Sequence, residues 1–160
     1  MELKNVISEE LVFFLDVQDT EELFESIATR LQGKGIVKSS YLPALKQREK
    51  EFPTGLATEL FGVALPHTDA EHVNEEAISI GVLKQPVTFR HMGMGAQEVE
   101  VKLVFMLALQ KPENQLEVLQ TVTSLIQNKA FMEAVTKCAS EKEVIDTVLN
   151  YAEVSVSNNK

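Results

Sequence analysis

Hydrophobic positions near the start of the chain form a short run and then recur at helical spacing. Residues 11–17 are mostly apolar over a short length, which favours a strand. Asp19 followed by Glu22 is typical of a capped helix start. The face of that predicted helix consists of Leu23, Phe24, Ile27, Ala28 and Leu31. A second helix is predicted from Ser40 to Phe52, because the residue before a proline avoids helical backbone angles.

The middle of the chain has the pattern of strands. Residues 62–65 form an apolar run that ends at Pro66, and residues 77–83 and 87–90 read as two strands separated by Gln85-Pro86. From residue 99 apolar and charged residues alternate, and residues 103–109 are then all apolar. This change indicates a strand that enters the buried centre of a sheet.

Helical spacing returns in the last third of the chain. The segments 116–126 and 130–135 are predicted helices, and Ser140 with Glu143 repeats the capping pattern before a final helix. Helices therefore flank a central group of strands. We expect one layered α/β domain over residues 1–152, a sandwich with a mixed sheet flanked by helices, followed by a polar C-terminal tail over residues 153–160.

Composition and charge narrow the classes of function. A chain of 160 residues with 44% hydrophobic and 24% charged residues is typical of a globular domain. The formal net charge of -9 argues against nucleic-acid binding, which needs a basic face. The single cysteine excludes an intrachain disulfide, and residues 103–109 are far too short an apolar run to insert in a membrane. With no secretory signal at the N-terminus, we expect a cytoplasmic protein.

The segment from Arg48 to His72 contains most of the candidate chemistry, including two of the three histidines. His67 directly follows an apolar strand and a proline, where a rigid scaffold meets an open loop. One interpretation is a loop histidine without a chemical role. A second is a metal ligand, joined by Asp69, Glu71 and His72. However, His67 and His72 are five residues apart, not the four that align two imidazoles on one helix face.

Two further interpretations make His67 reactive. It suits general acid–base catalysis, with Asp69, Glu71 or Glu51 orienting the ring. Alternatively, its neutral ring is a nucleophile that takes up a phosphoryl group, with Arg48 and Thr54 among the donors to the phosphoryl oxygens. The chain has no nucleotide phosphate-binding loop, so we expect no direct use of ATP. We also expect no other cofactor and no metal ion.

The motif residues Arg48-Glu49-Lys50-Glu51-Phe52-Pro53-Thr54-Gly55, followed by a short strand and Pro66-His67, resemble a known family. They resemble the EIIA components of the sugar phosphotransferase system, in the fructose–mannitol superfamily. Pro66-His67-x-x-Ala70-x-His72 is most similar to the galactitol type. The resemblance covers about residues 5–150 and implies the same mixed-sheet sandwich.

The resemblance also implies an activity. His67 would accept a phosphoryl group from the phosphocarrier protein HPr and pass it to a cysteine of the cognate EIIB. The membrane component EIIC would then couple this transfer to uptake of a sugar or polyol. Arg48 takes the place of the family's phosphoryl-stabilising arginine. The same fold also serves nitrogen-type regulators, in which phosphorylation of the histidine controls partner binding, and this remains the alternative function.

One position departs from the mannitol-type pattern, which has a second histidine at the start of the helix after the last long strand. Gln115 stands near that place here, and the galactitol-type pattern offers His72 instead. Gln115 can donate a hydrogen bond through its amide but cannot carry a charge. We therefore expect a supporting shell around His67 drawn from Thr54, Glu51, His72 and Gln115.

Overall fold

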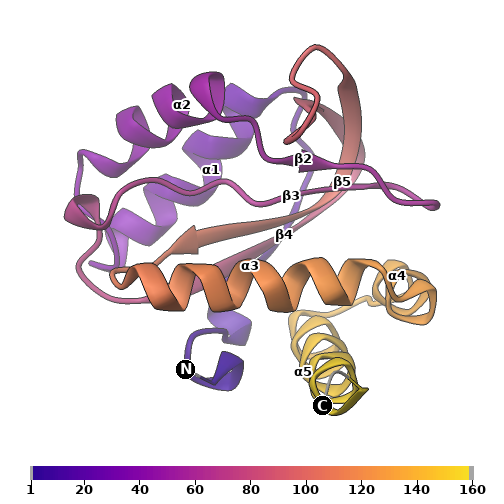
Figure 1. The fold of residues 1–160 in the computed structure, drawn as a ribbon. Helices are drawn as coiled ribbons and strands as arrows, with labels where there is room; N and C mark the ends of the chain where they lie inside the picture. Colours follow the sequence, from indigo (N-terminus) through magenta and orange to yellow (C-terminus); the bar gives the residue numbers. More distant parts are fainter. Residues whose placement is uncertain (1, 159–160) are drawn as a thin grey trace.

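The computed structural model describes residues 2–158, with side chains described as far as residue 152. Its five strands form one mixed sheet in the order β1-β4-β5-β3-β2 (Figure 1). The outer β1 runs parallel to β4, the central β4 and β5 are antiparallel, β3 runs parallel to β5, and β2 is antiparallel to β3. The strands are β1 (Val12–Leu15), β2 (Gly55–Leu56), β3 (Gly62–Ala64), β4 (Ala77–Arg90) and β5 (Glu98–Ala108).

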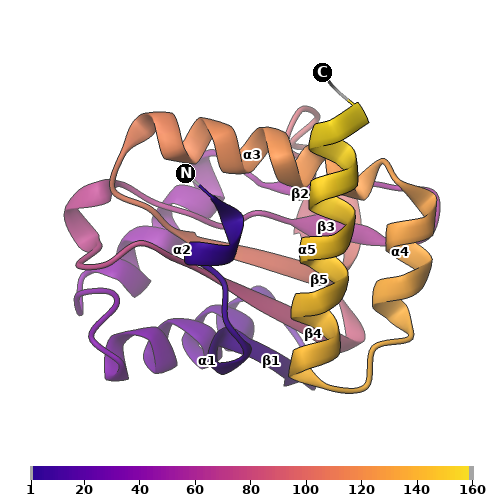
Figure 2. The same ribbon diagram turned by 90° about the horizontal axis from the view of Figure 1, so that it is seen from below.

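Helices cover both faces of this sheet (Figures 1 and 2). On one face lie α1 (Thr20–Gly33) and α2 (Tyr41–Glu51), and on the other lie α3 (Pro112–Ile126), α4 (Lys129–Thr136) and α5 (Glu141–Asn158). Three short 3-10 helices are η1 (Leu3–Asn5), η2 (Glu9–Leu11) and η3 (Ala70–His72). The expected α/β sandwich with a mixed sheet is confirmed.

Each face of the sheet has its own hydrophobic core. Val104 and Met106 of β5 pack with α1 and α2, whereas Leu103 and Phe105 pack with α3, α4 and α5. Successive residues of a strand point to opposite faces, so a strand covered on both sides must be apolar at every position. This explains the unbroken apolar run that the sequence shows at the end of β5.

Several local predictions are confirmed and others are corrected. Asp19 caps α1 by accepting a hydrogen bond from the backbone N–H of Glu22 at 2.9 Å, as predicted. The two expected strands around Gln85-Pro86 are one strand, β4, because a shift in register against β5 between Val82 and Val87 accommodates the interruption. The backbone of residues 153–158, within the expected tail, continues α5 as far as Asn158, and residues 159–160 of that tail lie outside the described residues.

The parallel pairing of β3 and β5 determines where the candidate residues lie. Both strands end at the same edge of the sheet, and the pairing continues past β3, where His67 lies opposite Leu107. The backbone N–H of Leu107 donates to the carbonyl of Pro66 at 2.9 Å. The segment after β3 therefore lies beside the connection from β5 to α3, between α2 and α3 (Figure 1).

Candidate functional site

A backbone hydrogen bond fixes the orientation of the His67 ring. Its Nδ1 lies 2.7 Å from the carbonyl oxygen of Leu65. A carbonyl oxygen can only accept, so Nδ1 carries the proton and donates. In the neutral ring, Nε2 then keeps its lone pair. The local chain thus presents Nε2 as the nucleophilic or basic nitrogen.

The surroundings of His67 favour this neutral form. The side chain is partly buried, and burial lowers the pKa of His67 because it disfavours the charged ring. The hydrogen bond to Leu65 opposes this effect, the positive charge of Arg48 lowers the pKa further, and the negative charge of Asp69 raises it. The net shift is downward, so His67 stays unprotonated to a lower pH than an exposed histidine.

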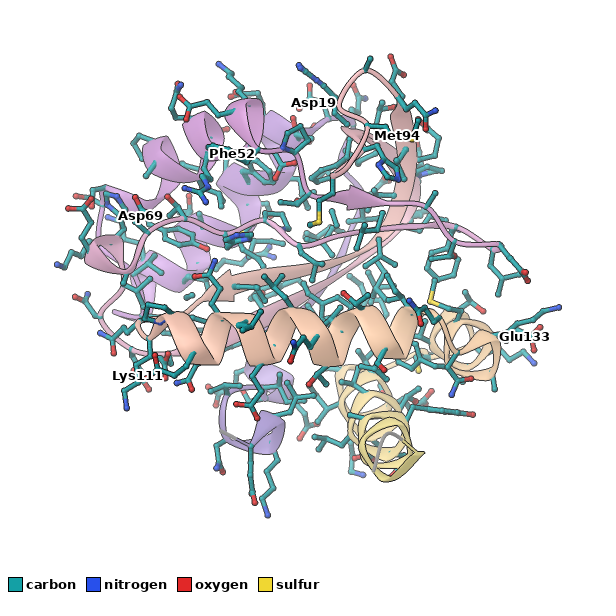
Figure 3. The ribbon with its side chains drawn as sticks, in the orientation of Figure 1. Asp19, Phe52, Asp69, Met94, Lys111 and Glu133 are labelled. Atoms are coloured by element: carbon teal, nitrogen blue, oxygen red, sulfur yellow. The ribbon has the colours of Figure 1, made fainter. Side chains whose placement is uncertain are left out.

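Arg48 extends from the last turns of α2 towards the segment after β3. Its Cζ lies 4.5 Å from the centroid of the Phe52 ring, and its Nη1 is 3.7 Å from Oδ1 of Asp69. Figure 3 shows Phe52 at the end of α2 and Asp69 on the segment that follows β3. The Nε of Arg48 is buried and has no hydrogen-bond partner in the described part of the chain. A guanidinium held in this way has donors left for an anion beside His67.

Thr54 and Glu49 form a second layer beneath the site. The carboxylate of Glu49 accepts from the backbone N–H and the hydroxyl of Thr54, both at 2.8 Å. The Thr54 hydroxyl in turn accepts from the backbone N–H of Leu65 at 3.3 Å. Burial raises the pKa of Glu49 to about 7, although the bonds from Thr54 lower it. Thr54 therefore supports the site from below and does not face an incoming anion.

Tyr41 supports the strand opposite His67. Its ring is fully buried at the start of α2, and its hydroxyl donates to the carbonyl of Leu107 at 2.8 Å. Burial raises the pKa of this phenol, which keeps it protonated as a donor. Helix α2 thus contributes three side chains to the site: Arg48 beside Asp69, Glu49 bound to Thr54, and Tyr41, at the start of the helix, bound to Leu107.

The other expected members of the shell lie in different places. The carboxylate of Glu51 is exposed and accepts from Gln47 at 2.7 Å, so the partner of the His67 Nδ1 is the Leu65 carbonyl and not Glu51. His72 is on η3, where its Nδ1 lies 2.8 Å from the hydroxyl of Ser40 and its Nε2 lies 3.5 Å from Glu71. Ser40, where the second helix is predicted to begin, stands at the N-cap of α2, but its side chain makes no capping bond.

Gln115 occupies the first turns of α3, which begins at the edge of the sheet where His67 lies. Glu76 holds this helix start: its Oε2 accepts from the backbone N–H groups of Gln110 at 2.8 Å and Lys111 at 3.3 Å, and its Oε1 accepts from Asn114 at 2.9 Å. These bonds lower the pKa of Glu76 despite its desolvation. Figure 3 places Lys111 at this end of α3, on the same side of the molecule as Asp69.

Exposed apolar side chains flank the arginine side of the site. Phe52 is 57% exposed and Met94 is 56% exposed. The loop of Met94 is stabilised by His91, whose Nδ1 accepts from the backbone N–H groups of Gly93 at 3.0 Å and Met94 at 3.1 Å. The backbone N–H of Met92 donates to the carbonyl of Gly55 at 2.8 Å, which attaches this loop to the segment after Phe52. The end of α2 and this loop therefore both expose apolar side chains.

Sequence reasoning missed Glu49, Tyr41 and Glu76. Glu49 reads as part of a charged helix end, and the chain gives no sign that one face of that end is buried. Glu76 directly precedes β4, and this position was the one sign in the sequence that its side chain lies at the edge of the sheet. Its partners could not be predicted, because they lie more than thirty residues away along the chain. Contacts over such separations depend on the strand register and leave no local pattern.

The structure also bears on metal binding and membrane insertion. Among the described residues, no three histidine, cysteine, aspartate or glutamate side chains are grouped so that they could hold a metal ion. His67 and His72 instead bind different partners, on Leu65 and Ser40. Over residues 2–158, none of the helices combines the length and apolar character needed to cross a bilayer.

Comparison with known proteins assigns the chain to a family. Residues 5–151 match the family model described as the phosphoenolpyruvate-dependent sugar phosphotransferase system, EIIA 2. The galactitol-specific EIIA component of Escherichia coli K12 is 32% identical over 117 residues, which are 72% of this chain and 76% of that protein.

Solved structures show the same fold. Enzyme IIA of the mannitol system, in its complex with phosphorylated enzyme IIB from Escherichia coli, has a TM-score of 0.74 at 19% identity, covering 91% of this chain and 99% of that one. The nitrogen regulatory protein IIA from Neisseria meningitidis has a TM-score of 0.71 at 23% identity, covering 90% and 97%. The chain therefore belongs to the EIIA 2 family of the phosphoenolpyruvate-dependent sugar phosphotransferase system.

Proposed function

We propose that this protein is a cytoplasmic phosphocarrier that accepts a phosphoryl group from phosphorylated HPr on Nε2 of His67. The observation that carries the proposal is the bond between the His67 Nδ1 and the Leu65 carbonyl, because it leaves the Nε2 lone pair free. The lowered pKa of His67 supports it, since the ring must be neutral to attack phosphorus. Membership of the EIIA family supports the same chemistry.

The proposed transfer uses neither a metal ion nor a nucleotide. Nε2 attacks phosphorus, a new P–N bond forms, and the bond between phosphorus and its donor atom on HPr breaks. Nδ1 keeps its proton, so the phosphorylated ring carries a positive charge that the Leu65 carbonyl stabilises as a hydrogen-bond acceptor. The guanidinium of Arg48 binds the phosphoryl oxygens and stabilises the charge that moves between donor and acceptor.

The phosphoryl group then passes to a cysteine thiolate of a cognate EIIB. The P–Nε2 bond breaks, a P–S bond forms, and His67 returns to its neutral Nδ1–H form. The similarity to an enzyme IIA solved in complex with phosphorylated enzyme IIB supports this partner. A membrane EIIC would couple the transfer to uptake of a galactitol-like polyol or sugar, which the similarity to the galactitol-specific component supports.

Phosphoenolpyruvate, enzyme I and HPr test the first step. We expect the wild-type protein to gain an acid-labile, base-stable phosphoryl group, and the His67→Ala variant to gain none. His72→Ala should remain a substrate, because the His72 ring is bound to Ser40. Label on the His67→Ala variant, or no label on folded wild-type protein, would refute the proposal.

A regulatory role is the second candidate, and the similarity to a nitrogen regulatory protein IIA favours it. In that case phosphorylation of His67 changes which protein binds, and no EIIB accepts the phosphoryl group. Adding purified EIIB and EIIC membranes to the labelled protein separates the two functions. Loss of label that depends on EIIB, with phosphorylated galactitol as product, supports transport, whereas label that persists with every EIIB supports regulation.

A further inference from the structure

A continuous series of hydrogen bonds joins α2 to the ring of His67. We call it the Glu49 relay, and it consists of Glu49, Thr54, Leu65 and His67. Its links are the Thr54 hydroxyl to Glu49 at 2.8 Å, the Leu65 N–H to the Thr54 hydroxyl at 3.3 Å, and the His67 Nδ1 to the Leu65 carbonyl at 2.7 Å. The Thr54 N–H also donates to Glu49 at 2.8 Å.

The direction of each bond follows from the groups involved. When Glu49 is ionised, as it is above about pH 7, its carboxylate can only accept, so the single hydroxyl proton of Thr54 points at Glu49. The lone pairs of that oxygen are then left for the N–H of Leu65. Leu65 is fully buried and its N–H is held by Thr54, which restricts the backbone at Leu65 and so limits how far its carbonyl can turn from the Nδ1 of His67.

We propose that Glu49 is a positioning residue for the phosphoryl acceptor: through Thr54 and Leu65 it holds His67 as the Nδ1–H tautomer with Nε2 unprotonated. This inference rests on the proposed function of His67. It assigns a task to a charged side chain that touches neither the ring nor an incoming phosphoryl group. Thr54 is the intermediate element, held at both its N–H and its hydroxyl by the same carboxylate.

A glutamine at position 49 cannot reproduce these bonds. Its amide oxygen can accept from one of the two Thr54 donors, but its NH2 group then faces the other donor. If the NH2 group faces the hydroxyl, Thr54 must turn its own proton away from position 49. The NH2 group and the N–H of Leu65 then compete as donors to the hydroxyl oxygen of Thr54. Either arrangement loosens the Leu65 carbonyl, and the Nε2–H tautomer then becomes populated.

Four variants separate positioning from general structural damage. Glu49→Gln and Thr54→Val break the relay, whereas Thr54→Ser keeps the hydroxyl. Glu25→Gln is the matched control, since it removes one exposed carboxylate of α1 that pairs with Lys46 of α2 at 3.6 Å. Long-range ¹H–¹⁵N spectra of the imidazole nitrogens report the tautomer of His67 independently of any phosphotransfer, and they are recorded well above pH 7, where the ring is neutral and Glu49 is ionised.

We expect the Nδ1–H tautomer in the wild type, Thr54→Ser and Glu25→Gln, and mixed tautomers in Glu49→Gln and Thr54→Val. The rate of phosphoryl uptake from HPr should fall by roughly 10- to 100-fold in the latter two, as expected for a misplaced nucleophile. If Glu49→Gln does not fold, the Thr54→Val and Thr54→Ser pair decides the question.

The two readouts distinguish failure of the relay from failure of the proposed function. An unchanged tautomer in folded Glu49→Gln and Thr54→Val overturns the relay, even if their uptake rates fall. A shift of tautomer in these variants, with no phosphoryl uptake by the wild type, supports the relay and refutes the carrier function.

Discussion

The buried hydroxyl of Tyr41 offers a direct test of how α2 supports the site. Tyr41→Phe removes one oxygen and keeps the ring, so it creates almost no change in packing. The hydroxyl donates to the Leu107 carbonyl at 2.8 Å in a fully buried position. Losing such a bond removes about 0.5–1.5 kcal/mol, and an unsatisfied buried carbonyl costs about 1–3 kcal/mol. We expect a loss of about 1–2 kcal/mol in the free energy of unfolding.

That loss corresponds to a fall in Tm of roughly 2–8 °C for a chain of this size. Urea and thermal denaturation followed by circular dichroism measure both quantities. Tyr151→Phe is the matched control, because the Tyr151 hydroxyl has no hydrogen bond within the described residues and its ring packs on Phe131 at 5.8 Å. It should change stability by less than about 0.5 kcal/mol. Equal losses in the two variants would refute the reasoning.

Three further predictions concern the pKa of His67, the pH dependence of stability and the close packing at Gly62. In an NMR titration, the pKa of His67 should lie below its ordinary value. It should rise in Arg48→Gln and fall in Asp69→Asn, because the two charges act on the ring in opposite directions. A fall in Arg48→Gln with a rise in Asp69→Asn would contradict this. Because the pKa of Glu49 is about 7 in the folded state against 4.5 unperturbed, its contribution to stability is fully present below pH 4.5 and is lost as pH rises through 7. Denaturation from pH 4.5 to 8 should show up to roughly 3 kcal/mol of this loss in the wild type and none in Glu49→Gln. Gly62→Ala should destabilise by about 1–3 kcal/mol in the same assay, because its Cβ would lie 2.6 Å from the Glu100 carbonyl; unchanged stability would contradict that contact.

The layered fold could be predicted because the spacing of apolar residues differs between helices with one buried face and strands buried on both faces. The helical spacing from Leu23 to Leu31 predicts the buried face of α1, and all of its apolar members are buried. The apolar run 103–109 predicts a strand covered on both faces, as β5 is. The interruption at Gln85-Pro86 could not be interpreted locally, because β4 continues past it only through a shift in its register with β5.

The site is only partly local in sequence. The Pro66-His67 motif and Arg48 could be identified because the family resemblance includes them, but their partners depend on tertiary contacts. Glu51 and Glu49 are two residues apart on α2, and the sequence predicts Glu51, rather than Glu49, as a partner of the ring. The structure separates them, since Glu51 is exposed and bound to Gln47, whereas Glu49 faces inwards and binds Thr54.

Arg48 has two effects on the proposed reaction that act in the same direction. Its positive charge helps to lower the pKa of His67, which keeps the ring neutral before transfer. After transfer, the same charge faces a phosphoryl group and stabilises it. Asp69 opposes both effects, because it binds Arg48 at 3.7 Å and raises the pKa of His67. Since the Asp69 side chain is 69% exposed, its ion pair is weak and solvent-screened. A phosphoryl dianion on Nε2 can therefore displace Asp69 from the guanidinium at little cost, so the arrangement that prepares the nucleophile need not hinder the product.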